Sequence, residues 1–205
     1  FAINGIGSVS EYTFTISNSG GIPATTMTDP ASLAAPFAFK GGAYPGTGGN
    51  CGVTLAASGS CTVVVTYSPT AAVISNDIIE IDYDDGVGAQ QSTRAVQGTG
   101  SNLAFLTVSH GPTFDFGTNA TASTSDHNFT VTNSGGVSAT SMIGSGLVAP
   151  FTFKDGTYPG TGGDCGVSLT ASGSCTVVVA YSPSAAGIHN DTLTIDYDDG
   201  SVVQQ

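Results

Sequence analysis

The chain has 205 residues, of which 15 are acidic and only 3 are lysine or arginine, so its formal net charge is −12 at pH 7. This charge repels phosphate backbones and anionic lipid headgroups, which argues against nucleic acid and membrane surfaces as partners. No apolar run approaches the roughly 18 residues of a membrane-spanning helix, so direct membrane insertion is not expected.

One sequence pattern occurs twice. Residues 36–86 recur as residues 150–200 without a gap and with roughly three-quarters identity. The match continues upstream, where residues 12–21 correspond to residues 127–136, one residue out of register with the later stretch. Self-similarity at a period of about one immunoglobulin-sized domain predicts two tandem domains. They are residues 1–100 and residues 101–205.

Apolar and polar residues alternate along most of the apolar segments, which is typical of half-buried β-strands. The 29 glycines and 9 prolines interrupt these segments at short intervals, and no segment shows a helical apolar stripe. About seven strands in each repeat predict an all-β fold of two immunoglobulin-like β-sandwiches. In chain order the predicted strands are 12–17, 37–40, 51–55, 61–67, 78–83 and 90–98, then an opening strand of the second repeat from 103–108 with 114–116, followed by counterparts of the earlier strands.

The two ends of the chain fall at different points of the repeat. Phe1 aligns with Phe116, so we expect the first repeat to lack the opening strand that the second repeat has. Gln205 aligns with Gln91, so we expect the second repeat to lack its closing strand. A missing strand leaves backbone groups unpaired and core residues such as Phe14 uncovered. We therefore expect a longer protein, in which its own continuing chain or a neighbouring subunit supplies the flanking strands.

The four cysteines form two matched pairs with the same spacing in each repeat. That spacing is wider than the short knuckles of zinc ribbons, and no histidine recurs beside both pairs, so a zinc site is not expected. We predict one disulfide within each repeat, which indicates an oxidising compartment: the periplasm, the cell surface or the extracellular medium. The predicted bonds are Cys51–Cys61 and Cys165–Cys175.

Several motifs of the repeat resemble a known family. They are Phe-Thr-Val-Thr-Asn-Ser-Gly-Gly at 129–136, Cys-Gly-Val-x-Leu-x-Ala-Ser-Gly-Ser-Cys-Thr-Val-Val-Val-x-Tyr-Ser-Pro-x-Ala-Ala at 51–72 and 165–186, and Ile-Asp-Tyr at 81–83 and 195–197. These motifs resemble the choice-of-anchor D repeats of bacterial surface proteins, which are similar to the ASPM/SPD-2/Hydin and PapD-like immunoglobulin folds. The resemblance implies a tandem extracellular array in a large exported bacterial protein and implies no catalytic residues.

An acidic Asp-Tyr-Asp-Asp-Gly segment occurs once in each repeat. Several carboxylates in one turn are the ligands that calcium prefers, although the spacing does not match an EF-hand loop. Asp-Asp-Gly also favours a hairpin turn, which is the structure we expect, with calcium as the alternative and no other cofactor. The candidate calcium ligands are Asp82, Asp84, Asp85, Asp196, Asp198 and Asp199.

A glycine-rich loop, residues 41–49 and their copy 155–163, contains Tyr44 in the first repeat and Tyr158 in the second. It does not resemble a phosphate-binding loop, because no Lys-Ser/Thr pair follows it and no helix is predicted to begin there. An exposed tyrosine at this position would stack on a sugar, whereas a tyrosine at the edge of the core would only cover apolar side chains. Both alternatives are consistent with the sequence.

The sequence does not indicate an enzyme. The three histidines all lie in the second half and have no counterparts in the first, and no Gly-x-Ser-x-Gly motif occurs. The leading hypothesis is a non-enzymatic structural or adhesive module of a stalk, fibre or filament, whose partners are neighbouring repeats or copies of itself. The rivals are a module that binds a surface glycan or protein through its end loops, and an accessory domain of a secreted hydrolase.

Overall fold

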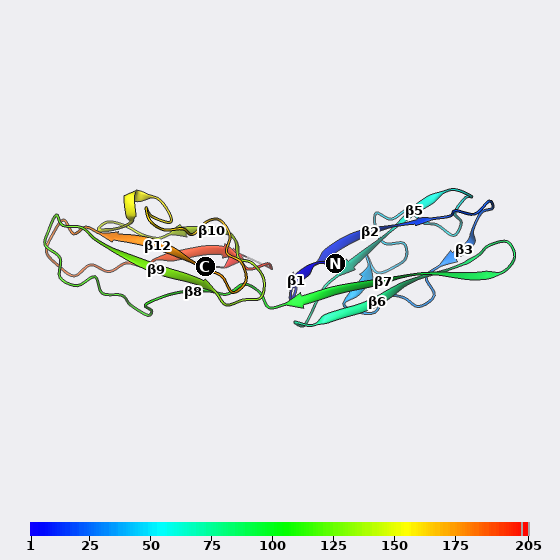
Figure 1. Ribbon diagram of the computed structural model, residues 1–205, viewed down its shortest axis with the longest axis horizontal. Coiled ribbons are helices and arrows are strands. Elements are labelled where there is room, and N and C mark those ends of the chain that lie inside the picture. Colours follow the sequence, from blue (N-terminus) through cyan, green and yellow to red (C-terminus); the bar gives the residue numbers. More distant parts are fainter. Residues whose placement is uncertain (202, 205) are drawn as a thin grey trace. The chain divides into compact units, whose positions relative to one another are not determined.

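The computed structural model describes residues 1–201 and the backbone of residues 203–204. It is all-β: the described residues form fourteen strands, one three-residue 3-10 turn and no α-helix. The chain divides into two compact units, Phe1–Ser101 and Asn102–Gln205, which we call unit 1 and unit 2 (Figure 1). The division lies one residue beyond the predicted boundary. No helix in the described part of the chain has the length and apolar character needed to cross a membrane.

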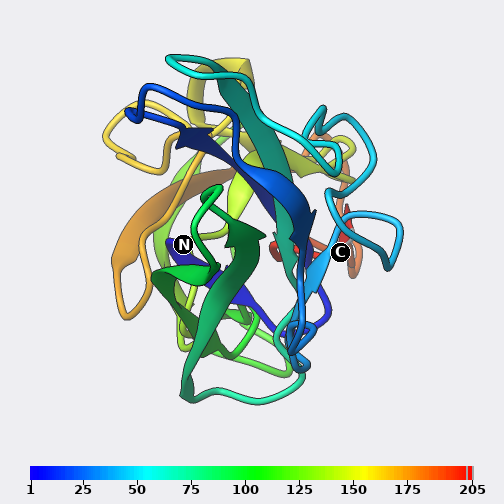
Figure 2. The same ribbon diagram turned by 90° about the vertical axis from the view of Figure 1, so that its right-hand side faces the viewer.

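Unit 1 contains two sheets. Strands β1, β7, β6 and β3 form one sheet in that order, and β2, β5 and β4 form the other, so β2 lies beside β5 (Figure 2). All pairings are antiparallel except that of β1 with the end of β7, which is parallel. The strands are β1 (Ile3–Gly5), β2 (Ser10–Ser17), β3 (Thr25–Thr28), β4 (Phe37–Phe39), β5 (Ser60–Tyr67), β6 (Ile74–Asp84) and β7 (Ala89–Ser101).

Unit 2 also contains two sheets, with one strand added and others shortened. The first sheet has the order β11-β12-β9-β8, and the second has the order β10-β13-β14. Strand β9 is the counterpart of β2, and β8 pairs with its outer edge. The strands are β8 (Leu106–Val108), β9 (Ser125–Asn133), β10 (Thr140–Ser145), β11 (Phe151–Phe153), β12 (Ser174–Tyr181), β13 (Thr194–Asp198) and β14 (Val203–Gln204), with the 3-10 turn Lys154–Gly156 after β11.

Each unit has one hydrophobic core that receives side chains from both of its sheets. In unit 1, Val63 and Val65 of β5 are fully buried together with Ile79 and Ile81 of β6. Because successive side chains of a strand point to opposite faces, the predicted alternation supplies one apolar face to each sheet. Complete burial of a side chain of this size stabilises the fold by about 1.5–3 kcal/mol.

Three strand predictions differ from the structure. Residues 51–55 form no strand, and only Leu55 makes an isolated bridge, to Ala24. Residues 114–116 also form no strand: their phenylalanine rings pack inwards, but no neighbouring strand runs beside them, and Pro112 just before them has no N–H to donate. The predicted loss of the closing strand of unit 2 is wrong in part, because β14 pairs with β13 over two residues.

Candidate functional site

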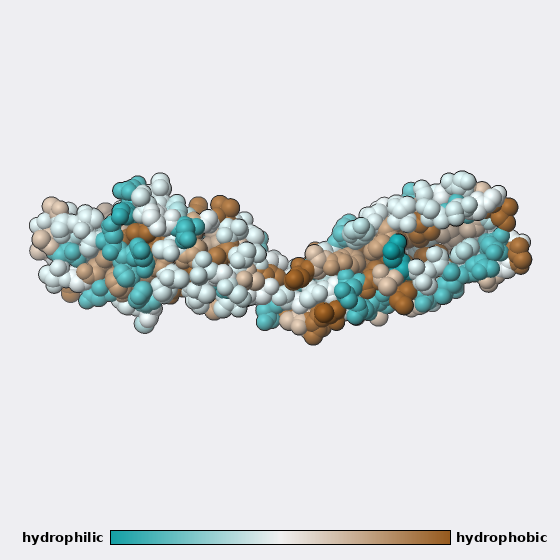
Figure 3. Space-filling model, viewed as in Figure 1, coloured by the Kyte–Doolittle hydropathy of each residue, from teal (hydrophilic) through white to brown (hydrophobic). Residues whose placement is uncertain are grey.

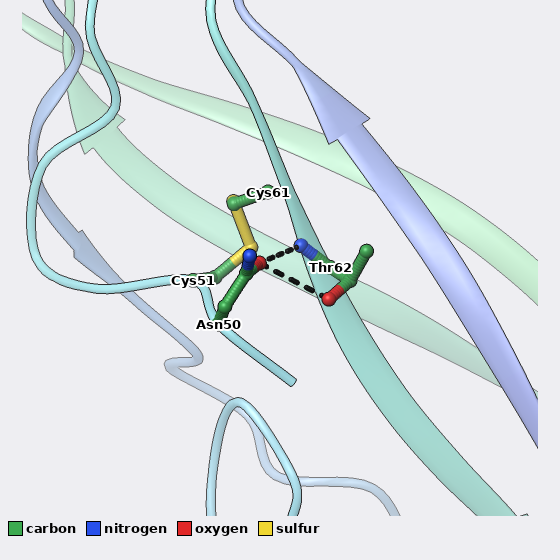
Figure 4. The surroundings of a disulfide bond; sticks show 4 residues. All are labelled: Asn50, Cys51, Cys61 and Thr62. Carbon is green, nitrogen blue, oxygen red and sulfur yellow. Dashed lines mark hydrogen bonds between the residues drawn. A yellow bond between two sulfur atoms is a disulfide. The ribbon is translucent and has the colours of Figure 1, made fainter. Parts of the chain in front are cut away.

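A disulfide attaches the long loop of each unit to a central strand. In unit 1 it joins Cys51 to Cys61 with the Cα atoms 4.8 Å apart, the pairing that the sequence predicts. Beside it, the backbone N–H of Thr62 donates to Oδ1 of Asn50 at 2.7 Å and the Thr62 hydroxyl donates to the same atom at 3.1 Å (Figure 4). The covalent bond and these hydrogen bonds hold the end of the loop on β5.

Unit 2 repeats this arrangement with one substitution. Cys165 is bonded to Cys175, with the Cα atoms 4.9 Å apart. Asp164 stands where unit 1 has Asn50, and its Oδ1 accepts the backbone N–H of Thr176 at 2.6 Å. The role of this position therefore depends on a side-chain oxygen, which asparagine and aspartate both provide.

The glycine-rich loop lies directly on the neighbouring strand. Val64 N–H donates to the carbonyl of Pro45 at 2.8 Å, and Lys40 N–H donates to the carbonyl of Val64 at 2.9 Å. Gly46 has a φ of +88°, and a Cβ at this position would lie 2.2 Å from the carbonyl oxygen of Val64. Gly160 has the same φ and the same close approach to Val178. Close packing of two backbones, rather than a ligand, explains this glycine.

Tyr44 and Tyr158 lie at the edge of the core. Each ring makes an edge-on contact with a buried phenylalanine, Phe39 at 5.7 Å and Phe153 at 5.6 Å between ring centroids. Both rings are half-buried, and both hydroxyls are buried without a hydrogen-bond partner in the described structure. Burial raises the pKa of both hydroxyls, and the charge of Asp29 adds to the effect at Tyr44. This geometry matches the core-edge alternative.

The Asp-Asp-Gly segment of unit 1 closes the hairpin between β6 and β7. Gly86 N–H donates to Oδ1 of Asp84 at 2.7 Å, and Oδ1 of Asp85 accepts the N–H groups of Val87 at 2.9 Å and Gly88 at 3.0 Å. These backbone bonds to Val87 and Gly88 hold the pKa of Asp85 below its ordinary value. Gly86 has the positive φ, +87°, that such a turn requires.

The corresponding segment of unit 2 repeats two of these bonds. Asp198 accepts the N–H of Gly200 at 2.8 Å, and Asp199 accepts the N–H of Ser201 at 2.9 Å. The first aspartate of each segment has a separate partner: Asp82 accepts from the amide of Gln91, and Asp196 accepts from the hydroxyl of Ser145. Among the described residues, no three acidic, histidine or cysteine side chains are grouped closely enough to hold a metal ion. Four of the six calcium candidates thus accept N–H groups of the turns: Asp84, Asp85, Asp198 and Asp199.

The histidines belong to unit 2 alone. Nδ1 of His110 lies 2.9 Å from the hydroxyl of Ser109 and 3.4 Å from Nε2 of His127. Burial, followed by the nearby His110, lowers the pKa of His127. The third histidine, His189, bonds the hydroxyl of Tyr181 at 2.9 Å. Unit 1 has Tyr12 where unit 2 has His127, so the imidazole pair is not part of the repeated structure.

Two asparagines that our sequence analysis did not single out bind several backbone groups at the ends of β2 and β9. The Nδ2 group of Asn18 donates to the carbonyls of Ile22, Leu55 and Ala56, and that of Asn133 makes the three corresponding bonds in unit 2. Oδ1 of Asn18 accepts the N–H of Gly20. The recurrence of Asn-Ser-Gly-Gly in both repeats is the signal that could have identified them.

Comparisons with known proteins give only remote similarities. No family model matches the chain, and no curated protein matches it. A protein of unknown function from Porphyromonas gingivalis W83 has 9% sequence identity and a TM-score of 0.36, covering 88% of this chain and 78% of that one. The secreted serine protease VesC from Vibrio cholerae has 13% identity and a TM-score of 0.33, covering 96% of this chain. The match spans 49% of VesC, about half of its length.

Proposed function

We propose that this chain is a non-enzymatic spacer: two immunoglobulin-like β-sandwich repeats in a stalk, fibre or filament of an exported bacterial protein. One observation carries the proposal. The two units duplicate four restraining features, namely the disulfide, the glycine loop on its strand, the Asp-Asp-Gly turn and the asparagine network. Duplication of the restraints favours repeated mechanical units over a specialised binding tip.

The disulfides support an extracytoplasmic location. Thiols paired within a domain persist in the periplasm, at the cell surface or outside the cell, whereas the cytosol keeps them reduced. Both bonds close a short loop and leave no free cysteine among the described residues. The resemblance of the repeat motifs to choice-of-anchor D modules agrees with an exported array whose partners are neighbouring repeats.

The distribution of the histidines supports a role without catalysis. A catalytic group that served the module would recur with the module, but the Ser109–His110–His127 contact occurs in unit 2 only. The half-buried positions of Tyr44 and Tyr158 likewise offer less to a saccharide than exposed rings would. The spacer therefore explains more of the repeated structure than a glycan-binding module does.

Stretching the 205-residue chain from its two ends in a force spectrometer tests the proposal. We expect two unfolding steps under sustained load. Each disulfide closes a separation of 10 residues, so reductant should lengthen each step by about 35 Å, at about 3.5 Å per extended residue. If the units unfold without measurable resistance and the protein binds saturably on a glycan array, the spacer is the wrong function.

A further inference from the structure

Strand β2 of unit 1 has an unpaired edge where its counterpart in unit 2 has a neighbour. In unit 2, β8 pairs antiparallel with β9 from Leu106 opposite Asn133 to Val108 opposite Val131. Within the described structure, β2 pairs with β5 alone. The same sequence element is therefore an edge strand in one unit and an inner strand in the other.

The difference in pairing changes the burial of the same core positions. In unit 2, Val131 and Asn133 are completely buried and Phe129 is 9% exposed. Their counterparts in unit 1, Ile16, Asn18 and Phe14, are all partly exposed. Phe1 packs against Phe14, with the ring centroids 6.4 Å apart, but no strand of the described chain pairs with β2 on this side to cover Phe14 and Ile16.

In unit 2, residues 102–109, which include β8, cover the outer edge of β9, and we call them the covering segment. The polar groups that hold this segment in unit 2 are also present in unit 1. In unit 2, Ser134 N–H donates to the carbonyl of Phe105 at 2.9 Å, and Phe105 N–H donates to Oδ1 of Asn133 at 3.1 Å. Leu106 N–H reaches the hydroxyl of Tyr197 at 3.3 Å. The corresponding residues of unit 1 are Ser19, Asn18 and Tyr83.

A glycine marks the path of the covering segment. Gly135 is buried, and a Cβ there would lie 2.1 Å from the carbonyl oxygen of Leu103 and 2.5 Å from Cα of Ala104. Its counterpart Gly20 is exposed, and the nearest atom to a Cβ there is Oδ1 of Asn18, at 3.1 Å. Unit 1 has the small residue that a crossing strand needs, without a crossing strand in the described structure.

The uncovered side of unit 1 is a groove. It runs between β2 and β7, and apolar side chains are visible in the hollow between these strands (Figure 3). Two adjoining depressions share Ile16, Ile81 and Ser92, so the groove is continuous along the edge of β2. One of the two depressions also reaches Gly20 and Tyr83, the positions at which unit 2 binds its covering segment.

We propose that the β2 edge of unit 1 is a strand-accepting site whose occupant is an extended segment with the chemistry of residues 102–109, supplied by another repeat of this kind. That segment reads Asn-Leu-Ala-Phe-Leu-Thr-Val-Ser. Ala104, Leu106 and Val108 pack against the core of unit 2, while Phe105 between them is 60% exposed. An uncharged strand with this alternation would form backbone hydrogen bonds with β2 and would at the same time cover the apolar groove. The inference assigns an interaction site and does not depend on the spacer function.

A synthetic peptide tests the site. The probe has the sequence of residues 102–109, with two lysines added for solubility, and it is titrated into the isotopically labelled 205-residue protein. We expect saturable shifts of the backbone amide signals of Ser17, Ser19 and Gly20. The matched amides of unit 2, Thr132 and Gly135 among them, serve as an internal control and should not move, because their edge is already occupied.

Peptide and protein variants test the mode of binding. N-methylation at the positions of Phe105 and Ser109 removes two N–H groups that donate in unit 2, to Asn133 and to Thr130, and should weaken binding at least tenfold. A peptide of the same composition with its apolar pattern shifted by one residue should not bind. The variant Tyr83→Phe, which removes only a hydroxyl, should weaken binding severalfold while the spectrum of the free protein stays unchanged.

Three results would overturn the proposal. The first is the absence of saturable shifts at millimolar peptide. The second is a set of shifts in unit 2, which would mean that the peptide exchanges with the resident strand. The third is a dimer of the free protein in which the β2 edges of two copies pair with each other, because the occupant would then be β2 itself and not a segment like residues 102–109.

Discussion

Residues 74–84 and 188–198 have closely related sequences, but they differ in secondary structure. In unit 1 the whole stretch is β6, eleven residues long, and every residue of it has a partner in β7. In unit 2 only the last five residues form β13, and β14 pairs with the final two of them. The partner strand, rather than the local sequence, decides how far the strand extends.

The burial of side chains in this part of the two units also depends on the partner strand. Ile79 of β6 is 3% exposed, whereas its counterpart Leu193 is only partly buried; Ile188 is 92% exposed and its counterpart Ile74 is 62% exposed. In the other sheet unit 2 has the more deeply buried side chains, because β8 pairs with the outer edge of β9, whereas no strand in the described part of the chain pairs with the outer edge of β2. The pair shows how the neighbouring strand changes the environment of nearly identical residues.

The tyrosines at the ends of the central strands, Tyr67 of β5 and Tyr181 of β12, have different neighbours in the two units. In unit 1 the ring of Tyr67 covers Gly98 of β7, where an added Cβ would lie 2.6 Å from the ring. The hydroxyl of Tyr67 is buried and has no hydrogen-bond partner among the residues that the structure describes. In unit 2 the counterpart Tyr181 bonds to His189 instead, 2.9 Å away. One position therefore packs against a strand in one unit and against a side chain in the other.

The largest difference in stability between the units should appear when the phenylalanine of β9 or of β2 is replaced. Phe129→Ala should lower the free energy of unfolding of unit 2 by about 3–5 kcal/mol, the usual cost of removing a buried aromatic ring. Phe14→Ala should cost clearly less in unit 1, because Phe14 is already partly exposed. Hydrogen exchange of the Val177 and Val63 amides would report each unit separately. Equal costs would show that the two edges are equally covered in solution.

The disulfides should behave alike in both units, because all four cysteines are buried and both bonds have the same Cα separation to within 0.1 Å, 4.8 Å and 4.9 Å. Replacing Cys51 and Cys61 with alanine should cost about 2–3 kcal/mol, and replacing Cys165 and Cys175 should cost the same, since both loops have a separation of 10 residues. Denaturant unfolding of the two double variants provides the measurement. A large inequality would mean that the difference between the outer edges of β2 and β9 reaches the disulfides through Ile16 and Val131, which lie opposite Cys61 and Cys175.

The asparagines should show a smaller difference in the same direction as the phenylalanines. Asn133→Ala removes a completely buried side chain that also accepts from Phe105, and should cost about 2–3 kcal/mol. Asn18→Ala removes the same donor bonds from a partly exposed site and should cost about 1–2 kcal/mol. If the peptide of residues 102–109 binds unit 1, its presence should bring the cost at Asn18 closer to that at Asn133.

The smallest difference should be a pH effect confined to unit 2. Burial and His110 lower the pKa of His127 below its ordinary 6.5, so the folded unit holds this proton less tightly than the unfolded chain. The stability of unit 2 is therefore complete above pH 6.5 and falls as the pH decreases through that value. The control His127→Tyr, which copies Tyr12 of unit 1, should abolish the change. A loss that persists in this variant would have another cause.

Much of the structure of this protein could be predicted from its repeated sequence alone. Alternation of apolar residues predicted the all-β fold, and the central strands β5 and β12 lie almost where it placed them, because a half-buried strand needs one apolar face. The matched cysteines predicted both disulfides, and Asp-Asp-Gly predicted the hairpin turn of unit 1.

Only the tertiary structure decided which of the duplicated residues are covered. Residues 51–55 alternate like a strand, but they are held by the disulfide and a single bridge, so no ladder forms. Ile16 and Val131 occupy the same place in the repeat, and only Val131 is sealed from solvent. The reason is physical: the hydrogen bonds of a strand and the burial of its outer face come from a neighbouring strand, which a local sequence pattern does not contain.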